Sequence, residues 1–265
     1  MKKLVFDYEM KLTFSSPVTD HRFQLRCVPA TGPRQQVVDV EVAIEPDVEL
    51  ETTIDSFDSV VMTGFIPQPH TIFSYSVKGI AFVDNAHIKS EIYKPLYRFN
   101  SALTIPGPCI ESMIAACRER IAGLPADATP IDQAWEVMDE VYQAFTYTPA
   151  STTIRTTAEQ ALAQRKGVCQ DYAHVMLSVC RHVGLTAATS RACWAARCDA
   201  RMVEIYHDGR WIGLDPTHNR MVDDNYITIA HGRDYRDCML DIGIFSGYQV
   251  QQNQWVNASV HEQLL

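Results

Sequence analysis

The sequence predicts an α+β protein in which a β-rich, sandwich-like N-terminal domain precedes a core of helices and strands. Apolar and polar residues alternate strictly from Leu4 to Phe14, which is the period of a half-buried strand, and similar runs continue to about residue 95. After Pro108 the apolar residues recur at helical spacing, and from Val203 the alternating pattern returns. The change of period therefore separates the β-rich part from the mixed core.

Length and composition are those of a globular protein. The 265 residues suffice for one large domain or two modest ones, and a content of 46% hydrophobic and 21% charged residues excludes a disordered chain. The formal charge of −9 argues against nucleic acid and against an anionic membrane as the main partner.

The N-terminus, MKKLVFDYEMKLTF, has a strand pattern and not that of a signal peptide. It contains two lysines but neither an apolar core nor a small-residue cleavage site. No apolar stretch approaches the ~20 residues that span a bilayer. We therefore expect a cytoplasmic protein whose eight cysteines are reduced. Cys193 and Cys198 have no second pair of ligands nearby, so a zinc site is not expected.

Three segments are expected along the chain. They are a β-rich domain over residues 1–95, the core over 96–248, and a C-terminal strand or tail over 249–265. Within the first segment, Ser15-Ser16-Pro17 is expected to end the first strand. Further strands are expected over 23–27, 38–44 and 72–83.

The core is expected to contain four helices followed by a hairpin. The helices are expected over 110–121, over 131–145 with Asp132 as N-cap, from a Thr156–Glu159 capping box to Gly167, and over 169–183. The Asp208-Gly209 pair is typical of a tight hairpin turn. Asp215-Pro216 then ends the second strand of that hairpin.

Cys169 is the candidate nucleophile. It opens the last expected helix, and a helix N-terminus lowers the pKa of a thiol through its unpaired N–H groups and its dipole. Gly167 allows a sharp turn just before it, so that the sulfur can face a cleft. Most cysteines are small buried hydrophobes, and position alone leaves both interpretations open.

A cysteine nucleophile in acyl transfer also needs a histidine on a neighbouring element and a group that orients the imidazole. Asp215, at the end of a predicted strand, is the candidate for the orienting group. The alternative is an ordinary role, since aspartate before proline commonly starts a turn.

Two stretches carry a resemblance to a known family. TTAEQALAQRKGVCQDYAH, residues 156–174, and WIGLDPTHN, residues 211–219, resemble the transglutaminase-like cysteine hydrolases. Residues 4–18 resemble the start of the N-terminal domain found in the bacterial branch, and residues 223–237 resemble the segment after the catalytic aspartate. The resemblance implies a papain-like transglutaminase core, with helices packed on an antiparallel sheet.

The resemblance also implies a mechanism. Cys169 attacks an amide carbonyl of a peptide or protein substrate, and Asp215 orients a histidine. Gln170 and Tyr172 flank the nucleophile in the family motif and are candidates for the substrate cleft. For Gln170, capping and packing of the helix is an equally good interpretation. The mechanism needs no metal or other cofactor.

The family histidine is missing from this sequence. The family motif His-Ala-Trp-Val-Glu-Val aligns through Val203-Glu204-Ile205, so the histidine position falls on Ala200. Alanine cannot accept a proton, and loss of one member of such a triad costs several orders of magnitude in rate.

The other histidines near the motifs are not expected to replace it. His174 stands five residues after Cys169 on the same helix and therefore lies far around its axis. His218 follows Asp215 too closely to lie across from the thiol, and His207 belongs to the hairpin turn.

Residues 187–202 match nothing in the family, although both flanks match. Codons that the genetic code permits for residues 188–196 encode a strand of the family type when the reading frame starts one base earlier. Codons permitted for residues 198–203 encode Ala-Thr-His-Ala-Trp when the frame starts one base later. We therefore hypothesise that residues 188–202 are an out-of-frame reading of a segment that had the histidine. The alternative is a naturally diverged homologue. Resequencing of the gene and an intact-mass measurement distinguish the two.

Two functions follow from these residues. The first is a cysteine-dependent amidase, peptidase or acyl transferase in which water or an amine resolves a Cys169 thioester. The second is a catalytically inactive module that holds a peptide or protein in the same cleft, which Ala200 favours. A redox-sensing thiol has less support, because no resolving cysteine is near in sequence.

Overall fold

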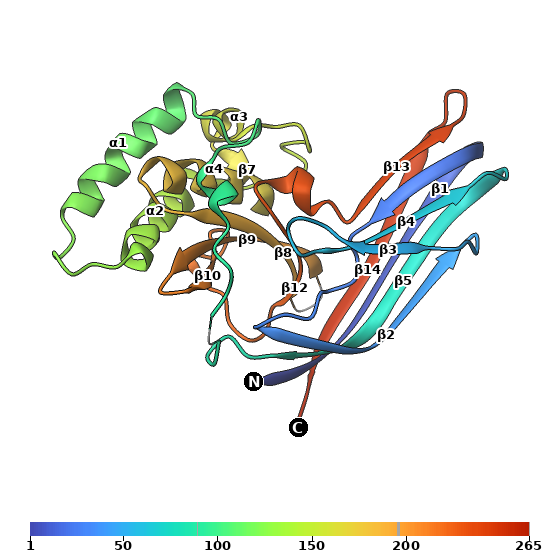
Figure 1. The fold of residues 1–265 in the computed structure, drawn as a ribbon. Coiled ribbons are helices and arrows are strands. Elements are labelled where there is room, and N and C mark those ends of the chain that lie inside the picture. Colours follow the sequence, from blue (N-terminus) through green and yellow to red (C-terminus); the bar gives the residue numbers. More distant parts are fainter. Residues whose placement is uncertain (89, 195–196, 265) are drawn as a thin grey trace.

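A curled sheet lies beside a second unit of helices and strands (Figure 1). The computed structural model describes the chain apart from residues 89, 195–196 and 265, and it describes no side chain of residues 194–199. Over the described residues, the first unit is a seven-stranded antiparallel sheet, and the second carries four α-helices on a five-stranded antiparallel sheet. The expected α+β class is confirmed. Of the helices described, none is long and apolar enough to cross a membrane.

Strand β1, Lys2–Leu25, is the centre of the curled sheet. Its first half pairs with β5 and β14, and its second half pairs with β4 and β13. The other strands of this sheet are β2 Gln35–Glu45, β3 Glu51–Ile54, β4 Val60–Ile66, β5 His70–Val83, β13 Asp241–Ser246 and β14 Gln252–Gln263. The last strand expected at the C-terminal end is therefore present as β14.

The expected break at Ser15-Ser16-Pro17 is wrong, because β1 continues through it. The pairing of β1 with β5 shifts register between Thr13 and Val18, where β1 begins to change partners. Proline lacks the N–H group that a ladder requires, and a register shift is a place where a strand tolerates it.

The second sheet has the strand order β11-β10-β9-β8-β12. Its strands are β8 Ala187–Trp194, β9 Arg197–His207, β10 Arg210–Asp215, β11 Arg220–Met221 and β12 Ile227–Gly232. The expected hairpin joins β9 to β10, and Asp208 and Gly209 both have positive φ, at 49° and 73°, as a tight two-residue turn requires.

The helices are α1 Pro108–Ala122, α2 Pro130–Ala144, α3 Ala158–Gln164 and α4 Cys169–His182, with short 3-10 turns η1 Pro95–Arg98 and η2 Tyr235–Cys238. A two-residue parallel pair joins β6 Thr146–Tyr147 to β7 Lys166–Gly167. All four helices share a core with Val203, Ile205 and Leu214, which point from β9 and β10 to one face of the sheet.

Two expected helix caps are shifted along the chain. Thr129, not Asp132, is the N-cap of α2, and Asp132 completes the capping box from the third helical position. For α3 the box is formed by Thr157 and Gln160, one residue later than expected. Glu159 instead caps another helix, because its carboxylate accepts the N–H groups of residues 107, 109 and 110 at the start of α1.

The two sheets share a hydrophobic core. Cys193 of β8 and Ile227 and Ile229 of β12 are buried among the apolar side chains of β1 and β5. Cys193 is also disulfide-bonded, which corrects the expectation that all cysteines are reduced. That expectation rested on the cell compartment, which does not reveal whether an individual cysteine is paired. The cysteines at 27, 109, 117, 169, 180 and 238 are not in disulfides.

Candidate active site

Cys169 is the first residue of α4, and its side chain is partly exposed. The N–H groups of Asp171 and Tyr172 turn back to the Val168 carbonyl, at 2.8 and 3.3 Å. Helix geometry then directs the N–H groups of Cys169 and Gln170 out of the N-terminal end. The positive end of the helix dipole lies at the same place, so the position favours a thiolate and a developing oxyanion.

A buried carboxylate holds the turn in front of Cys169. Asp171 Oδ2 accepts the Val168 N–H at 2.8 Å and the Thr152 hydroxyl at 2.7 Å. Burial raises the pKa of Asp171, and these two hydrogen bonds oppose the rise. A Cβ on Gly167 would lie 2.6 Å from the Cβ of Asp171. Glycine is therefore needed before Cys169 because of this close approach.

Asp215, at the end of β10, is 2% exposed and accepts four hydrogen bonds from the described residues. Its Oδ1 accepts the backbone N–H groups of Thr217 and His218, at 3.0 and 3.2 Å. Its Oδ2 accepts the Tyr226 hydroxyl and pairs with His218 Nδ1, both at 2.9 Å. The structure thus brings His218 into contact with Asp215, although the sequence analysis did not expect this histidine to belong to the site.

His218 and Tyr226 reach Asp215 by different routes. His218 is three residues away, and the backbone bonds to Oδ1 form the local turn that folds it back, so the D-P-T-H spacing was the signal available in the sequence. Tyr226 is the residue directly before β12, and no local pattern marked it. Arg220 donates to the Tyr226 hydroxyl and lies over its ring, with Cζ 5.5 Å from the centroid.

Ala200, the position of the family histidine, lies in β9 opposite Ala192 of β8. It packs against the buried cluster of Ala192, Met202 and Tyr226. Leu214 pairs with Val203 and both face the helices, so Asp215 and Met202 face the other side, together with Ala200. A side chain at position 200 would therefore share its face of the sheet with Asp215.

His174 has a structural role. It is 2% exposed, and its Nε2 accepts the Tyr235 N–H at 3.1 Å. Burial, assisted by the nearby Arg201 and Arg181 guanidinium groups, lowers the pKa of His174 to about 3. The imidazole is neutral at ordinary pH, with its only acceptor nitrogen already occupied, so it cannot take a proton from Cys169.

Gln170 and Tyr172 are both buried, at 8% and 3% exposure. The Tyr172 ring packs on Phe145, just after α2, with centroids 4.7 Å apart, and it belongs to the core of the four helices. The position of Tyr172 therefore fixes the first turn of α4 against the end of α2. A role of either residue in substrate binding stays a prediction.

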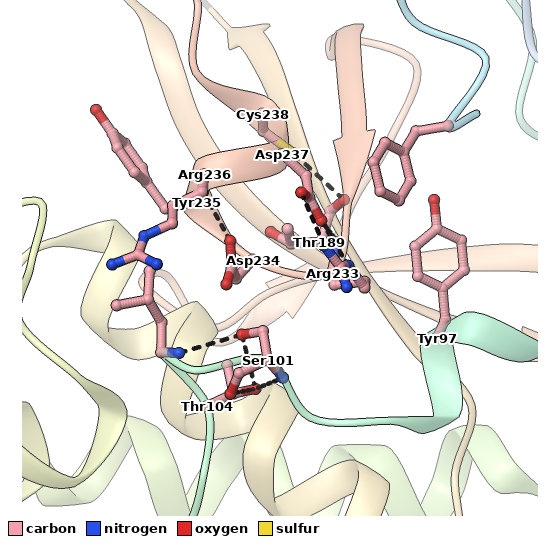
Figure 2. A network of polar contacts seen from close by, with 12 residues as sticks. Tyr97, Ser101, Thr104, Thr189, Arg233, Asp234, Tyr235, Arg236, Asp237 and Cys238 are labelled. Carbon is pink, nitrogen blue, oxygen red and sulfur yellow. Dashed lines mark hydrogen bonds and ion pairs between the residues drawn. The ribbon is translucent and has the colours of Figure 1, made fainter. Parts of the chain in front are cut away.

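The segment after β12 joins α4 to the second sheet (Figure 2). Asp234 accepts the Arg236 N–H and starts η2, and Arg233 is paired with Asp237 at 2.9 Å. Buried Arg181 of α4 donates to carbonyl oxygens of Tyr97, Ala187 and Arg233 and to the Thr104 hydroxyl, at 2.8–3.2 Å. Burial lowers the pKa of Arg181 to about 10. One guanidinium group thus ties the Cys169 helix to three other segments.

A charged cluster lies where the two sheets meet. A cavity of about 180 Å³ is lined there by Arg34, Glu91, Glu204 and His231, among others. Arg34 pairs with Glu91 at 2.8 Å and with Glu204 at 3.2 Å, and His231 approaches Glu204 at 3.4 Å. Burial would raise the pKa of Glu204, but Arg34 and His231 outweigh it and hold that pKa well below its usual range. Glu204 of the V-E-I stretch therefore joins the sheets.

No group of three or more histidine, cysteine, aspartate or glutamate side chains in the described part of the chain is arranged to hold a metal ion. The side chain of Cys198, which the sequence raised as a possible partner of Cys193 in a metal site, lies outside the described residues.

Known proteins resemble this chain in both units. Residues 115–216 match the transglutaminase-like superfamily, and residues 6–81 match the bacterial transglutaminase-like N-terminal region. An uncharacterized protein of Mycobacterium tuberculosis is 34% identical over 142 residues, which are 47% of this chain and 45% of that protein. An uncharacterized protein of Mycobacterium leprae is 26% identical over 258 residues, which are 88% of this chain and 90% of that protein.

The chain spans about half the length of the M. tuberculosis relative that it matches. Among solved structures, a candidate cysteine protease from Cytophaga hutchinsonii has a TM-score of 0.76 at 16% identity, covering 100% of this chain and 92% of that one. At this identity the likeness shows a shared fold. Together with the two sequence matches, it means that this chain contains a transglutaminase-like core preceded by a bacterial transglutaminase-like N-terminal region.

Proposed function

We propose that this protein performs cysteine-dependent chemistry on amide bonds of peptides or proteins. The observation that carries the proposal is the position of Cys169, a partly exposed thiol on the first residue of α4. In the proposed reaction the thiolate attacks the amide carbonyl, and the N–H groups at the start of α4 stabilise the oxyanion. The C–N bond breaks, the amine leaves with a proton, and a Cys169 thioester remains.

Water or a second amine then resolves the thioester, which gives hydrolysis or acyl transfer. A glutamine-containing peptide with hydroxylamine as the acceptor separates the two outcomes, because acyl transfer yields a hydroxamate and hydrolysis yields a free carboxylate. We expect product with the unmodified protein and none with Cys169→Ser. Cys109→Ser is the matched control, since Cys109 is also partly exposed and not in a disulfide. Equal turnover by Cys169→Ser would refute the proposal.

Ala200 favours a second function, in which the cleft binds a peptide without cleaving it. This function predicts that labelled peptides bind the protein while Cys169 forms no thioester detectable by intact mass. Binding without a thioester, in both the unmodified protein and Cys169→Ser, would favour the binding module over the enzyme.

A further inference from the structure

We propose that the cavity between the two sheets is a second binding site, which takes a small organic cation with an apolar body, such as an arylalkylammonium. Neither Cys169 nor Asp215 is among the described residues that line this cavity, so the inference goes beyond the proposed function and does not depend on it. The cavity has a volume of about 180 Å³. An engineered apolar cavity of about 150 Å³ binds benzene, so a single ring or a short chain that carries an amino group matches the space.

Hydrogen bonds hold the walls of the cavity in place. The Gln35 side chain, at the start of β2, donates to the Thr228 carbonyl at 2.7 Å and accepts the Thr228 N–H at 2.9 Å. On the segment that joins the two units, the Glu91 carboxylate accepts the Trp211 N–H at 2.7 Å, and the Trp211 indole N–H donates to the Ile92 carbonyl at 3.1 Å. Ile92 is 77% exposed, so the cavity opens to solvent on its side. A preformed cavity between two domains is a common form of ligand site.

Part of the lining is aromatic. Tyr97 projects from η1 (Figure 2), and the centroid of its ring lies 6.2 Å from that of Phe57 and 5.3 Å from that of Trp211. Aromatic rings attract cations through their quadrupole, and the attraction is strongest where water is excluded. Ala188, which is buried beside Tyr97 and Trp211, contributes only a methyl group to the lining. The walls therefore suit an apolar body with a positive charge.

The charges of the cavity select the sign of the ligand. Arg34 pairs with both Glu91 and Glu204, and the side chains of these three residues are 11%, 11% and 3% exposed. Two carboxylates therefore share one guanidinium group. His231 approaches Glu204 at 3.4 Å and compensates the second carboxylate only while it carries a proton. With His231 neutral, a bound ammonium group supplies the missing positive charge, whereas an anionic ligand would add to the excess of negative charge.

Two further observations agree with a cationic ligand. Among the described lining residues, Lys94 and Asp58 are also charged, but they pair with each other at 2.8 Å and leave the excess unchanged. The hydroxyl of Tyr97 is buried and has no hydrogen-bond partner in the part of the chain that the structure describes. A buried hydroxyl without a partner lowers stability, and an ammonium group is a donor for such an oxygen.

The test is isothermal titration calorimetry near pH 8 with three probes of similar shape, which are benzylamine, benzyl alcohol and benzoate. Near this pH benzylamine is a cation, whereas an ordinary histidine is neutral. We expect benzylamine to bind about tenfold more tightly than benzyl alcohol, because only the amine carries a charge for the rings and the shared carboxylates. Benzoate has the opposite charge and should not bind.

Two substitutions locate the bound probe. Ala188→Leu fills the cavity and should abolish the binding of benzylamine, whereas Ala122→Leu, at an exposed position of α1, is the matched control and should leave the affinity unchanged. Glu91→Gln removes the excess negative charge with little change of shape, so the preference for benzylamine over benzyl alcohol should be lost. Glu119→Gln, also exposed on α1, changes the net charge by the same amount and should retain the preference. Circular dichroism and thermal unfolding check that each variant is folded.

The inference is wrong if benzylamine does not bind the unmodified protein, or if benzyl alcohol or benzoate binds as tightly as benzylamine. It is also wrong if Ala188→Leu keeps the full affinity, because the probe is then bound elsewhere. Cys169→Ser should bind benzylamine like the unmodified protein, and a loss of binding in this variant would contradict a separate site. None of these results bears on the proposed function, since binding of the probes involves no reaction at Cys169.

Discussion

The buried His174 makes the stability of this protein depend on pH in a direction that the structure determines. Its pKa is lowered from 6.5 to about 3 in the fold, by burial first and then by the nearby Arg201 and Arg181. Between these two values the unfolded chain binds a proton that folded His174 does not bind. The contribution to stability is therefore complete above the unfolded pKa and is lost as the pH falls towards the folded one.

The size of the effect follows from the same shift. The free energy of unfolding changes by up to about 1.4 kcal/mol per pH unit inside this window, so the loss due to His174 between pH 7 and pH 5 is about 2 kcal/mol. His21, whose pKa burial and His70 lower to about 4, adds a loss of the same sign. A comparison of variants is therefore needed to isolate the part that belongs to His174.

We expect His174→Gln to reduce the loss between pH 7 and pH 5 by about 2 kcal/mol, because glutamine keeps an acceptor for the Tyr235 N–H but does not titrate. Urea unfolding at the two pH values gives the two free energies. His261→Gln, at an exposed position on β14, is the control and should retain the full dependence. The reasoning is refuted if His174→Gln loses as much stability as the unmodified protein.

Three further substitutions test other parts of the site. Arg181→Met leaves buried acceptors without a donor, which lowers the free energy of unfolding by about 1–3 kcal/mol for each acceptor, and removal of a buried charge offsets part of this loss. We expect a net loss of about 3 kcal/mol in urea unfolding, and an unchanged stability would contradict the role of Arg181. Tyr226→Phe should cost about 1 kcal/mol in urea unfolding, because the buried Asp215 loses a donor, whereas Tyr248→Phe, at an 84% exposed ring, should cost nothing measurable. Equal stability of the two variants would contradict the role of the Tyr226 hydroxyl. Gly167→Ala should lower both the Tm and the rate at which iodoacetamide alkylates Cys169, because the new methyl group meets Asp171 at 2.6 Å. Gly32→Ala is the control, since its methyl group would have no atom within 4 Å.

Local patterns in the sequence were sufficient for much of the fold. Strict alternation along β1 and the Asp208-Gly209 turn predict elements that the structure contains, because the period of a strand and the φ values of a tight turn are properties of neighbouring residues. The start of α4 at Cys169 was predicted for the same reason. Pro17 was misleading, since its tolerance depends on a change of strand partner that no neighbouring residue shows.

The site was only partly visible in the sequence. Cys169 and Asp215 stand in local motifs, whereas the contact between His218 and Asp215 depends on a turn that folds the chain back. The loss at Ala200 was clear from the sequence, but the packing of Tyr226 on that side of the sheet was not.

By itself the sequence determined most of the secondary structure and the resemblance to the transglutaminase-like superfamily, and it marked Cys169 as the candidate nucleophile, since each depends on the order and spacing of nearby residues. Only the tertiary structure decided which groups surround Asp215 and which carboxylates neutralise Arg34, whose partner Glu204 is 170 positions away. Such contacts join segments that are distant in the chain. Their partners are selected by the packing of two sheets and four helices, and a hydrogen bond depends on the final positions of both atoms to within a few tenths of an ångström.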